Sequence, residues 1–241
     1  MPHNSSAALR SAKGAVYRRR ESTPPIPARP CGPKQGLTMK RTLVAVLFLF
    51  SLAVMPARPE DGFRPLFDGK TLDGWDGDPR LWKVQDGMIV GSTEGVDLEK
   101  NSFLIYRKST FSDFILRAEV KLRNHNSGIQ FRSEALPGWV VKGYQADMAE
   151  GNWWGSIYDE LGTRGVMVNG WKGKAETVVK PNDWNQMEVT CKGDHIQVRV
   201  NGLLTAELHD SAKLEGILAL QLHRGPAMQV FFRNIRIKEL K

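Results

Sequence analysis

Short segments in which hydrophobic and polar residues alternate recur along the chain from residue 63 onward. Between residues 114 and 122, apolar side chains occupy every second position, and three of the positions between them are charged. Successive side chains of a β-strand point to opposite faces, so this pattern predicts a half-buried strand. Residues 185–191 and 230–240 predict further strands, and helical periodicity is weak throughout.

Two pairs of these segments are joined by dipeptides that favour tight turns. Asp86-Gly87 lies in the middle of residues 82–91 and suits a type I′ turn, whose residues need positive φ angles. Asn201-Gly202 divides residues 195–207 in the same way. Both ranges therefore predict β-hairpins, and the second should place alternate apolar residues between 196 and 200 on the core side.

Ten or more short antiparallel strands in one domain leave two main architectures, a two-sheet jelly-roll sandwich and a closed barrel. We favour the sandwich, because one sheet can present a polar face to a ligand while its other face packs on the second sheet. Glycines and three tryptophans between Lys142 and Lys180 indicate loops at the rim of that polar face. The predicted fold class is therefore all-β.

Polar side chains occupy strand faces that a half-buried strand would normally keep apolar. Gln130, Arg132 and Glu134 are expected to share one face of a strand over 127–134, because side chains alternate along it. Gln145 and Asp147 share a face of the next segment in the same way. Amide, guanidinium and carboxylate groups would thus meet if these faces line one hollow.

A third segment near the C-terminus has leucines at 218, 220 and 222 on one face, with Gln221 and His223 on the other. Trp153 and Trp154 follow each other in a glycine-flanked segment, so both cannot point inward if that segment is extended. We expect one of them to stack on a sugar ring. Together these groups favour a site for a polyhydroxylated ligand.

The formal charge of +8 is concentrated at the N-terminus. Residues 1–57 contain nine of the 34 Lys and Arg residues and one of the 26 acidic residues, so 25 of each remain for residues 58–241. A formally neutral body with interspersed signs is not typical of a nucleic-acid-binding surface.

The N-terminal residues predict a leader in two parts. Residues 1–38 are basic, rich in Pro and Ser, and without apolar periodicity, so we expect a disordered or non-native extension. Residues 39–57 begin with Met39-Lys40-Arg41, continue with an apolar run and end at Ala57, as a secretory signal peptide does. We expect translation from Met39, export to the periplasm or the medium, and no membrane span after cleavage. The alternative is an extended signal region or a membrane anchor.

Several stretches in order resemble the 3-keto-disaccharide hydrolase family, whose members are also called 3-keto-glucoside 1,2-lyase/3-keto-2-hydroxy-glucal hydratases. The stretches are Leu66–Trp75, Ser127–Arg132, Gly143–Asp147, Trp153–Glu160, Asn182–Asn185, Leu220–His223 and Phe232–Ile237. The resemblance covers about residues 62–241. It implies a concanavalin A-like jelly roll, an exported protein and a glycoside substrate already oxidised at C3. Many members carry Glu where Gln145 stands, so a proton-carrying role cannot be transferred to that amide.

The resemblance implies proton abstraction at C2, elimination of the C1 substituent and hydration, which needs a base, an acid and donors facing the enolate oxygen. Our catalytic candidates are Asp147 as first choice for the base, His223 as second choice or as a metal ligand, Arg132 for the enolate or keto oxygen, and Glu160 as a further proton carrier. Our substrate-binding candidates are Gln130, Glu134, Gln145, Trp153, Trp154, Tyr158, Asp159 and Gln221.

Each candidate also has a purely structural interpretation. Asp147 and Arg132 could form a structural ion pair, His223 could be an ordinary sheet histidine, and Asp159-Glu160 could end a solvated loop. A divalent ion would suit an enolate, but the sequence contains no metal-binding motif that fixes its ligands.

Two other functions fit the same residues. One is a non-catalytic carbohydrate-binding module on the same sandwich, which needs the tryptophans and amides but no titrating group. The other is an ordinary glycoside hydrolase in which Glu134 and either Asp147 or Glu160 form the carboxylate pair.

Overall fold

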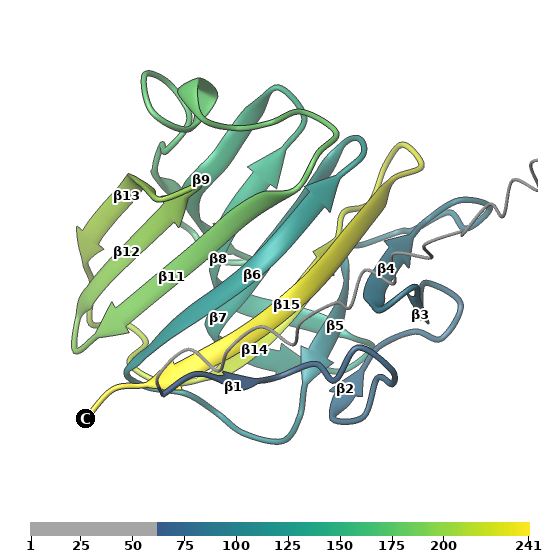
Figure 1. The fold of residues 1–241 in the computed structure, drawn as a ribbon, viewed down its shortest axis with the longest axis horizontal. Helices are drawn as coiled ribbons and strands as arrows, with labels where there is room; N and C mark the ends of the chain where they lie inside the picture. The colour runs from purple at the N-terminus through teal and green to yellow at the C-terminus, as the bar shows by residue number, and fades with distance from the viewer. Residues whose placement is uncertain (1–61) are drawn as a thin grey trace, which may run out of the picture. The chain divides into compact units, whose positions relative to one another are not determined.

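The computed structural model describes residues 62–241, whose strands form two antiparallel sheets (Figure 1). The first sheet contains, in spatial order, β13 (Leu203–His209), β12 (His195–Val200), β11 (Asn185–Lys192), β6 (Phe114–Leu122), β15 (Gln229–Glu239), β4 (Met88–Ser92) and β3 (Trp82–Gln85), with β1 (Arg64–Pro65) paired to β15. The second contains β10 (Gly165–Val168), β9 (Asn152–Glu160), β8 (Val140–Ala149), β7 (Asn126–Leu136), β14 (Ile217–Leu222), β5 (Ser102–Tyr106) and β2 (Trp75–Asp76). A short 3-10 helix, η1, covers Ala175–Thr177. The predicted all-β sandwich is confirmed.

The two hairpins predicted from their turn dipeptides are present. Asp86 and Gly87 have φ angles of 51° and 75° between β3 and β4, and Asn201 and Gly202 have 49° and 86° between β12 and β13. Both pairs thus have the positive φ angles of a type I′ turn. The strand predicted over residues 114–122 is β6 with those bounds.

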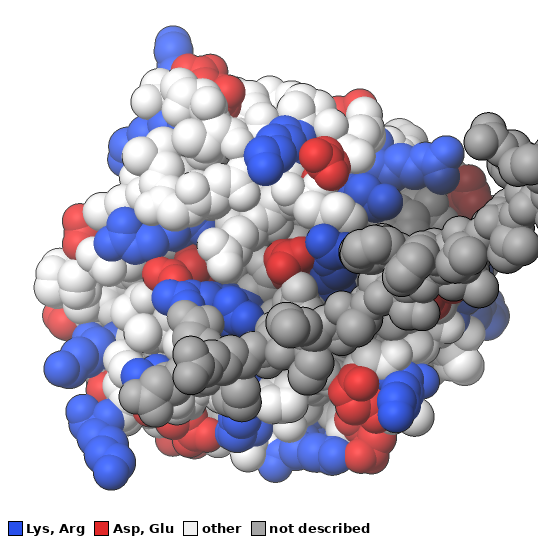
Figure 2. Space-filling view, in the orientation of Figure 1, with Lys and Arg blue, Asp and Glu red and all other residues white. Residues whose placement is uncertain are grey.

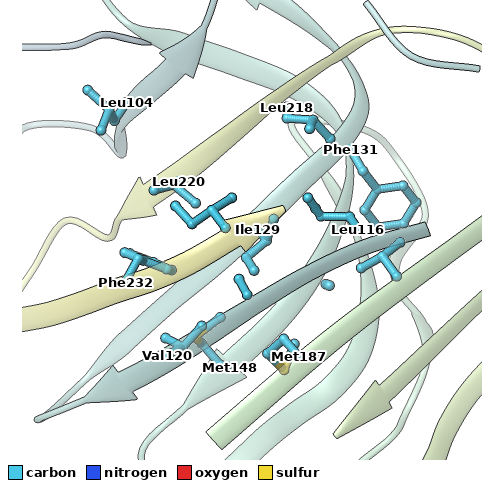
Figure 3. Packing of buried hydrophobic residues seen from close by; sticks show 14 of the residues in the cluster. Leu104, Leu116, Val120, Ile129, Phe131, Met148, Met187, Leu218, Leu220 and Phe232 are labelled. Carbon is cyan, nitrogen blue, oxygen red and sulfur yellow. The ribbon is translucent and has the colours of Figure 1, made fainter. Parts of the chain in front are cut away.

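The core lies between the two sheets (Figure 3). Leu116, Val120 and Phe232 from the first sheet are at most 2% exposed and belong to the same cluster as Ile129 and Leu220 from the second. Successive side chains along each strand point to opposite faces of its sheet, which is why each strand has one face in the core. Burial of this apolar surface is the main stabilising contribution to such a fold.

A second, smaller apolar cluster lies on the outer face of the second sheet. Phe103, Ile105, Val141 and Ala219 are each 0% exposed there. The far end of the β7–β8 hairpin covers them, because Phe103 N–H donates to the Trp139 carbonyl at 2.9 Å. The Trp139 indole also donates to an Asp76 carboxylate oxygen at 2.9 Å. Part of this outer face is therefore dry, and the rest remains available for a site.

The region between Lys142 and Lys180 differs from the sequence-based expectation of loops. Most of β8, all of β9 and all of β10 lie within it, and its glycines occur inside strands as well as in turns. Gly155 illustrates why: a Cβ at this position would lie 2.3 Å from the Thr205 hydroxyl oxygen, so the residue allows close packing between the sheets.

The outer face of the first sheet carries both signs of charge, as Figure 2 shows for the face seen in Figure 1. Arg117 pairs with Glu188 at 2.6 Å, and Arg233 pairs with Glu119 at 2.7 Å. The charges on this face therefore largely compensate each other. Residues 62–241 include no helix long and apolar enough to cross a membrane. The extension and signal peptide predicted for residues 1–57 lie outside the described residues.

Candidate functional site

The site is built on one row of cross-strand neighbours that runs across the outer face of the second sheet. In register, the row consists of Val166, Tyr158, Gln145, Gln130, Ala219 and Ile105. The row is apolar at both ends and carries amides at its centre. Its Ile105 end lies under the β7–β8 hairpin, whereas its Val166 end borders a cavity.

That cavity has a volume of about 570 Å³. Its polar side chains are Asn101, Asn126, Gln145, Asp147, Glu160, Gln221, His223 and Arg224. The cavity is also lined by Trp153, Tyr158, Leu161 and Val166, which we call the apolar wall, and by Gly162. A hollow of similar size on the first sheet, about 540 Å³, contains Glu94 as its only carboxylate. The cavity on the second sheet is therefore the better candidate for acid–base chemistry.

A directional chain of hydrogen bonds joins the two carboxylates of the cavity. Gln130 Nε2 donates to Gln145 Oε1 at 2.8 Å. The Gln145 amide then donates to Asp147 Oδ1 at 3.1 Å and to Gln221 Oε1 at 3.4 Å. Gln221 Nε2 donates to Glu160 Oε2 at 3.1 Å. Since every amide oxygen in this chain accepts and every amide nitrogen donates, the orientation of each side chain is fixed.

Gly128 makes room for this chain. A Cβ on Gly128, which pairs with Asp147 across β7 and β8, would lie only 2.3 Å from the Gln145 side-chain carbon Cδ. Gln145 therefore lies directly over the β7 backbone, and only a glycine allows that approach. The close approach explains how a residue on β8 reaches both Gln130 and Gln221.

Burial raises the pKa of both carboxylates in the cavity. Asp147 is only 5% exposed, and its pKa is raised to about 7, first because burial disfavours the charged form. Hydrogen bonds from Gln145, the Met148 N–H and Asn126 oppose the rise, and the charge of Glu160 adds to it. The pKa of Glu160 is also raised by burial, against hydrogen bonds from Asn101 and Gln221. Asp147 can therefore exchange a proton near neutral pH.

His223 lies at the edge of the cavity in an arrangement that fixes its tautomer. Its Nδ1 is 2.6 Å from the Arg224 carbonyl oxygen, which only accepts, so Nδ1 carries the proton and Nε2 is the acceptor of the neutral ring. His125 Nε2 donates to the same carbonyl at 3.1 Å, and the two imidazole rings are 5.0 Å apart. Burial lowers the pKa of His223, and the neighbouring His125 contributes in the same direction. The neutral ring is therefore favoured at neutral pH.

The family model of 3-keto-alpha-glucoside-1,2-lyase-like domains matches residues 62–238. The chain belongs to this family. The match includes every residue that lines the cavity, and it confirms the resemblance found in the sequence. A carbohydrate-active, lyase-like domain is therefore the general class of this protein.

Solved structures similar to this lyase-like domain support the sandwich fold. Two proteins from Parabacteroides distasonis, to which the name glycosyl hydrolase has been given provisionally, have TM-scores of 0.55 and 0.56 and identities of 23% and 20%; the alignments cover 74% and 75% of this chain and 99% and 94% of theirs. The carbohydrate-binding module CBM66 from Bacillus subtilis has a TM-score of 0.54 and 17% identity, over 69% of this chain and 96% of its own. At such identities the likeness shows the fold alone. No match was found among curated protein sequences.

The lyase-like domain does not use Arg132 as expected from the alternation along β7. Arg132 is 0% exposed and donates to the carbonyls of Ser112 and Gly193 at 2.8 and 2.7 Å, and to Asp113 at 3.1 Å. The cause is a β-bulge: β7 advances from Phe131 to Glu134 while β8 moves only from residue 144 to 142, and Arg132 has a φ of 47°. The extra residue turns the guanidinium away from the cavity, so Arg132 is neither a partner of Asp147 nor an enolate ligand.

Three further candidates also lie outside the cavity. Glu134 is exposed and pairs with Lys213 at 3.3 Å, so it is not part of a carboxylate pair in the cavity. Asp159 points to the opposite side of β9 from Glu160 and accepts from Arg164 Nε at 2.9 Å. Trp154 is 4% exposed and belongs to the core. Because side chains alternate along β9, the strand separates Asp159 from Glu160.

The remaining predicted residues are brought together. Asp147, His223, Glu160, Gln145, Trp153, Tyr158 and Gln221 line the cavity, and Gln130 supports it through Gln145. Sequence reasoning missed Asn101, Asn126, Leu161, Val166 and Arg224. Asn126 directly precedes the Ser127–Arg132 motif, which is the one local signal that could have found it. In the structure its Oδ1 is buried without a hydrogen-bond partner among the described residues. That free acceptor beside Asp147 is available to a ligand hydroxyl.

The possible divalent ion stays a prediction. Within residues 62–241, no three His, Cys, Asp or Glu side chains are grouped so that they could hold one metal ion. Asp147 and His223 line the same cavity, and Asp147 accepts hydrogen bonds from Gln145, Asn126 and the Met148 N–H.

Proposed function

We propose that this protein is an exported enzyme that cleaves glycosides oxidised at C3, by removal of the C2 proton, elimination of the C1 substituent and hydration. The observation that carries the proposal is the pair Asp147 and Glu160, both buried in one cavity with raised pKa values and linked through amides. Family membership supports a glycoside with a ketone at C3 as the substrate.

Asp147 is the base. A ketone at C3 acidifies the proton on C2, and the Asp147 carboxylate takes this proton while the C2–H electron pair forms the enolate. A pKa of about 7 lets the group accept a proton at neutral pH and still be partly ionised before the reaction. The hydrogen bonds from Gln145 and the Met148 N–H, at 3.1 and 3.0 Å, hold the carboxylate in place.

Glu160 is the acid that assists the leaving group. When the enolate electrons return, the ketone at C3 reforms, a C1–C2 double bond appears and the C1–O bond breaks. The departing oxygen takes the proton of Glu160, whose raised pKa keeps it protonated to a higher pH than an exposed glutamate. Water then adds its oxygen to C1 and gives a proton to the Glu160 carboxylate, while Asp147 returns its proton to C2, so that both side chains regain their starting state.

The enolate oxygen needs a hydrogen-bond donor. We assign this role to the guanidinium of Arg224, which lines the cavity, because Arg132 is bonded elsewhere. Arg224 follows His223 directly, and its N–H donates to the Asn101 side chain at 3.0 Å, which fixes its backbone at the edge of the cavity. A cation at the developing negative charge stabilises the transition state. His223 Nε2 and Asn126 Oδ1 are acceptors for sugar hydroxyls.

Turnover of a 3-keto-disaccharide by the full chain tests the proposal, with the unoxidised disaccharide as the second substrate. We expect release of 3-keto-glucose from the first alone, and a primary isotope effect on kcat/KM when C2 carries deuterium. Asp147→Asn should reduce kcat/KM by roughly 10²–10⁴-fold, the usual contribution of a general base. Asp76→Asn, at the far edge of the same sheet, is the matched control.

Ordinary glycoside hydrolysis is the second candidate, because two carboxylates in one cavity are also its requirement. That mechanism leaves the C2–H bond intact. Cleavage of the unoxidised disaccharide without a primary isotope effect at C2 would therefore favour hydrolysis and contradict the elimination. Binding of sugars without turnover of either substrate would favour a carbohydrate-binding module.

Export is the part of the proposal that depends on residues 39–57. Expression of the full chain followed by N-terminal sequencing of the mature protein tests it. A mature protein that starts shortly after Ala57 supports a signal peptide. An N-terminus before Met39 contradicts both the cleavage and the start site.

A further inference from the structure

Two of the large exposed hydrophobic side chains line the cavity. In residues 62–241, the large exposed ones are Leu161, Val166, Leu203 and Leu214. Leu161 is 56% exposed and Val166 is 40% exposed, and both belong to the apolar wall. A single exposed leucine is ordinary on a protein surface. Two beside Trp153 and Tyr158 in one cavity mark a binding surface.

The backbone at both ends of β9 is strained where it presents this wall. Leu161 has a φ of 53° and Trp153 has a φ of 63°, in the left-handed region that such residues rarely occupy. Strain of this kind persists where the surrounding structure imposes it, and it is concentrated at ligand sites. The wall is thus held in a conformation that the two side chains do not favour by themselves.

Ion pairs and hydrogen bonds fix the loop that follows β9. Arg164 Nε donates to Asp159 Oδ2 at 2.9 Å, and the same guanidinium pairs with Asp210. Tyr144 donates its hydroxyl proton to Asp210 Oδ1 at 2.6 Å. These contacts anchor residues 161–164 to the neighbouring strand β8 and to the segment after β13. The loop that carries Leu161 is therefore already fixed before a ligand binds, which reduces the loss of conformational entropy on binding.

The position of the wall indicates which part of a substrate it contacts. Leu161 follows Glu160, the group proposed to protonate the departing oxygen, and Val166 is the cross-strand neighbour of Tyr158. The substituent on that oxygen must then extend along the wall. Aromatic side chains accept both sugar rings and apolar rings, but Leu161 and Val166 offer no hydrogen bond to the hydroxyls of a second sugar. An apolar substituent loses no hydrogen bonds there and removes exposed apolar surface from water.

We propose that the apolar wall binds the leaving group, and that the preferred substrates are 3-keto-glucosides of aryl or alkyl alcohols in place of 3-keto-disaccharides. The inference rests on the proposed function, since the elimination places the departing oxygen beside Glu160. It names the class of substrate that this site accepts.

The test is the selectivity of the full chain between benzyl 3-keto-α-glucoside and a 3-keto-disaccharide of the same linkage. The double variant Leu161→Asn/Val166→Thr removes the aliphatic surface with little disturbance, because Asn tolerates positive φ and Thr matches the shape of Val. We expect the ratio of the two kcat/KM values to fall by roughly tenfold to a hundredfold in the double variant, as for other losses of apolar pocket contacts. Comparing ratios between the two proteins cancels the different acidities of the leaving groups.

Leu203→Asn and Leu214→Asn are the matched controls, because these leucines are exposed but do not line the cavity. Each should leave the ratio at the wild-type value. An unchanged ratio in the double variant would overturn the inference. A wild-type dimer, measured by light scattering, that dissociates in the double variant with no change in the ratio would assign the wall to a second copy of the chain.

Binding separates failure of this inference from failure of the proposed function. Titration calorimetry with unoxidised benzyl α-glucoside requires no turnover. If neither 3-keto substrate reacts, the proposed function fails, and the wall is judged from this titration alone. Weaker binding by the double variant than by the wild type then supports the apolar subsite, and equal binding overturns it. If the 3-keto-disaccharide reacts but the ratio of kcat/KM values is the same in the double variant and the wild type, the proposed function is supported and only the apolar subsite is contradicted.

Discussion

Replacing Asp147 by Asn should make the stability of the protein depend less on pH. The pKa of Asp147 is raised from 3.8 to about 7 in the folded protein, mainly by burial. Asn at this position resembles the protonated carboxyl group, and its side-chain oxygen can still accept from Gln145 and the Met148 N–H. The substitution therefore removes a charge that the folded state disfavours and keeps the hydrogen bonds that position it.

The raised pKa of Asp147 means that the wild type loses stability as the pH increases. Below the unfolded pKa, Asp147 is protonated in both states and makes its full contribution to stability. As the pH rises from about 4 to about 7, the unfolded state loses its proton first and folding becomes less favourable. A shift of about three pKa units corresponds to about 4 kcal/mol in the free energy of unfolding. That is a large fraction of the roughly 5–15 kcal/mol that stabilises a typical domain.

Urea unfolding at several pH values between 4 and 8 measures this effect. The free energy of unfolding of Asp147→Asn should increase relative to that of the wild type as the pH rises, by about 1.4 kcal/mol per pH unit in the steep region. The difference should reach a plateau above pH 7. Asp76→Asn should instead differ from the wild type by a nearly constant amount across this range, because hydrogen bonds from Trp139 and Arg107 lower the pKa of Asp76 and its contribution to stability changes only below about pH 4. A difference between Asp147→Asn and the wild type that is constant across this pH range would refute the reasoning on burial and charge.

Three further predictions distinguish residues that act in the cavity from residues that stabilise the fold. Gly128→Ala should reduce kcat/KM by roughly a hundredfold, because the new Cβ would displace Gln145, which kinetics of the variant can check. Arg132→Met should lower the free energy of unfolding by about 3–5 kcal/mol, because buried acceptors lose their donor, while the pH profile of kcat/KM keeps its shape. Trp154→Ala should cost about 3–5 kcal/mol in urea unfolding as a core truncation, whereas Trp153→Ala should raise KM and leave stability near the wild-type value.

Features of the fold that depend on neighbours in sequence could be predicted. The alternation in residues 114–122 gave the bounds of β6, because the period of two is a local property of an extended chain. Asp86-Gly87 and Asn201-Gly202 located two turns, because positive φ is a local requirement. The same reasoning placed Gln145 and Asp147 on one face, and both line the cavity.

The errors in the site arose where the structure depends on contacts between distant segments. One extra residue in β7 changed the face of Arg132, and alternation gives no sign of such a bulge. Asn101 lies 59 residues from Glu160 in the chain but donates to it at 3.0 Å. Leu161 and Val166 lacked a sequence signal altogether, because exposure at the rim of a cavity depends on how the loop after β9 is anchored.

The β7–β8 hairpin explains why one sheet face holds both a dry cluster and a reactive cavity. The far end of the hairpin covers Phe103 and Ala219, held by the bond between Trp139 and Asp76. In the same cross-strand row, the amide side chains of Gln130 and Gln145 follow directly after the covered residues. Water that enters the cavity therefore contacts Gln145 and not the apolar cluster. Asp147 lies toward the other end of β8, in the cavity, where its own burial raises its pKa.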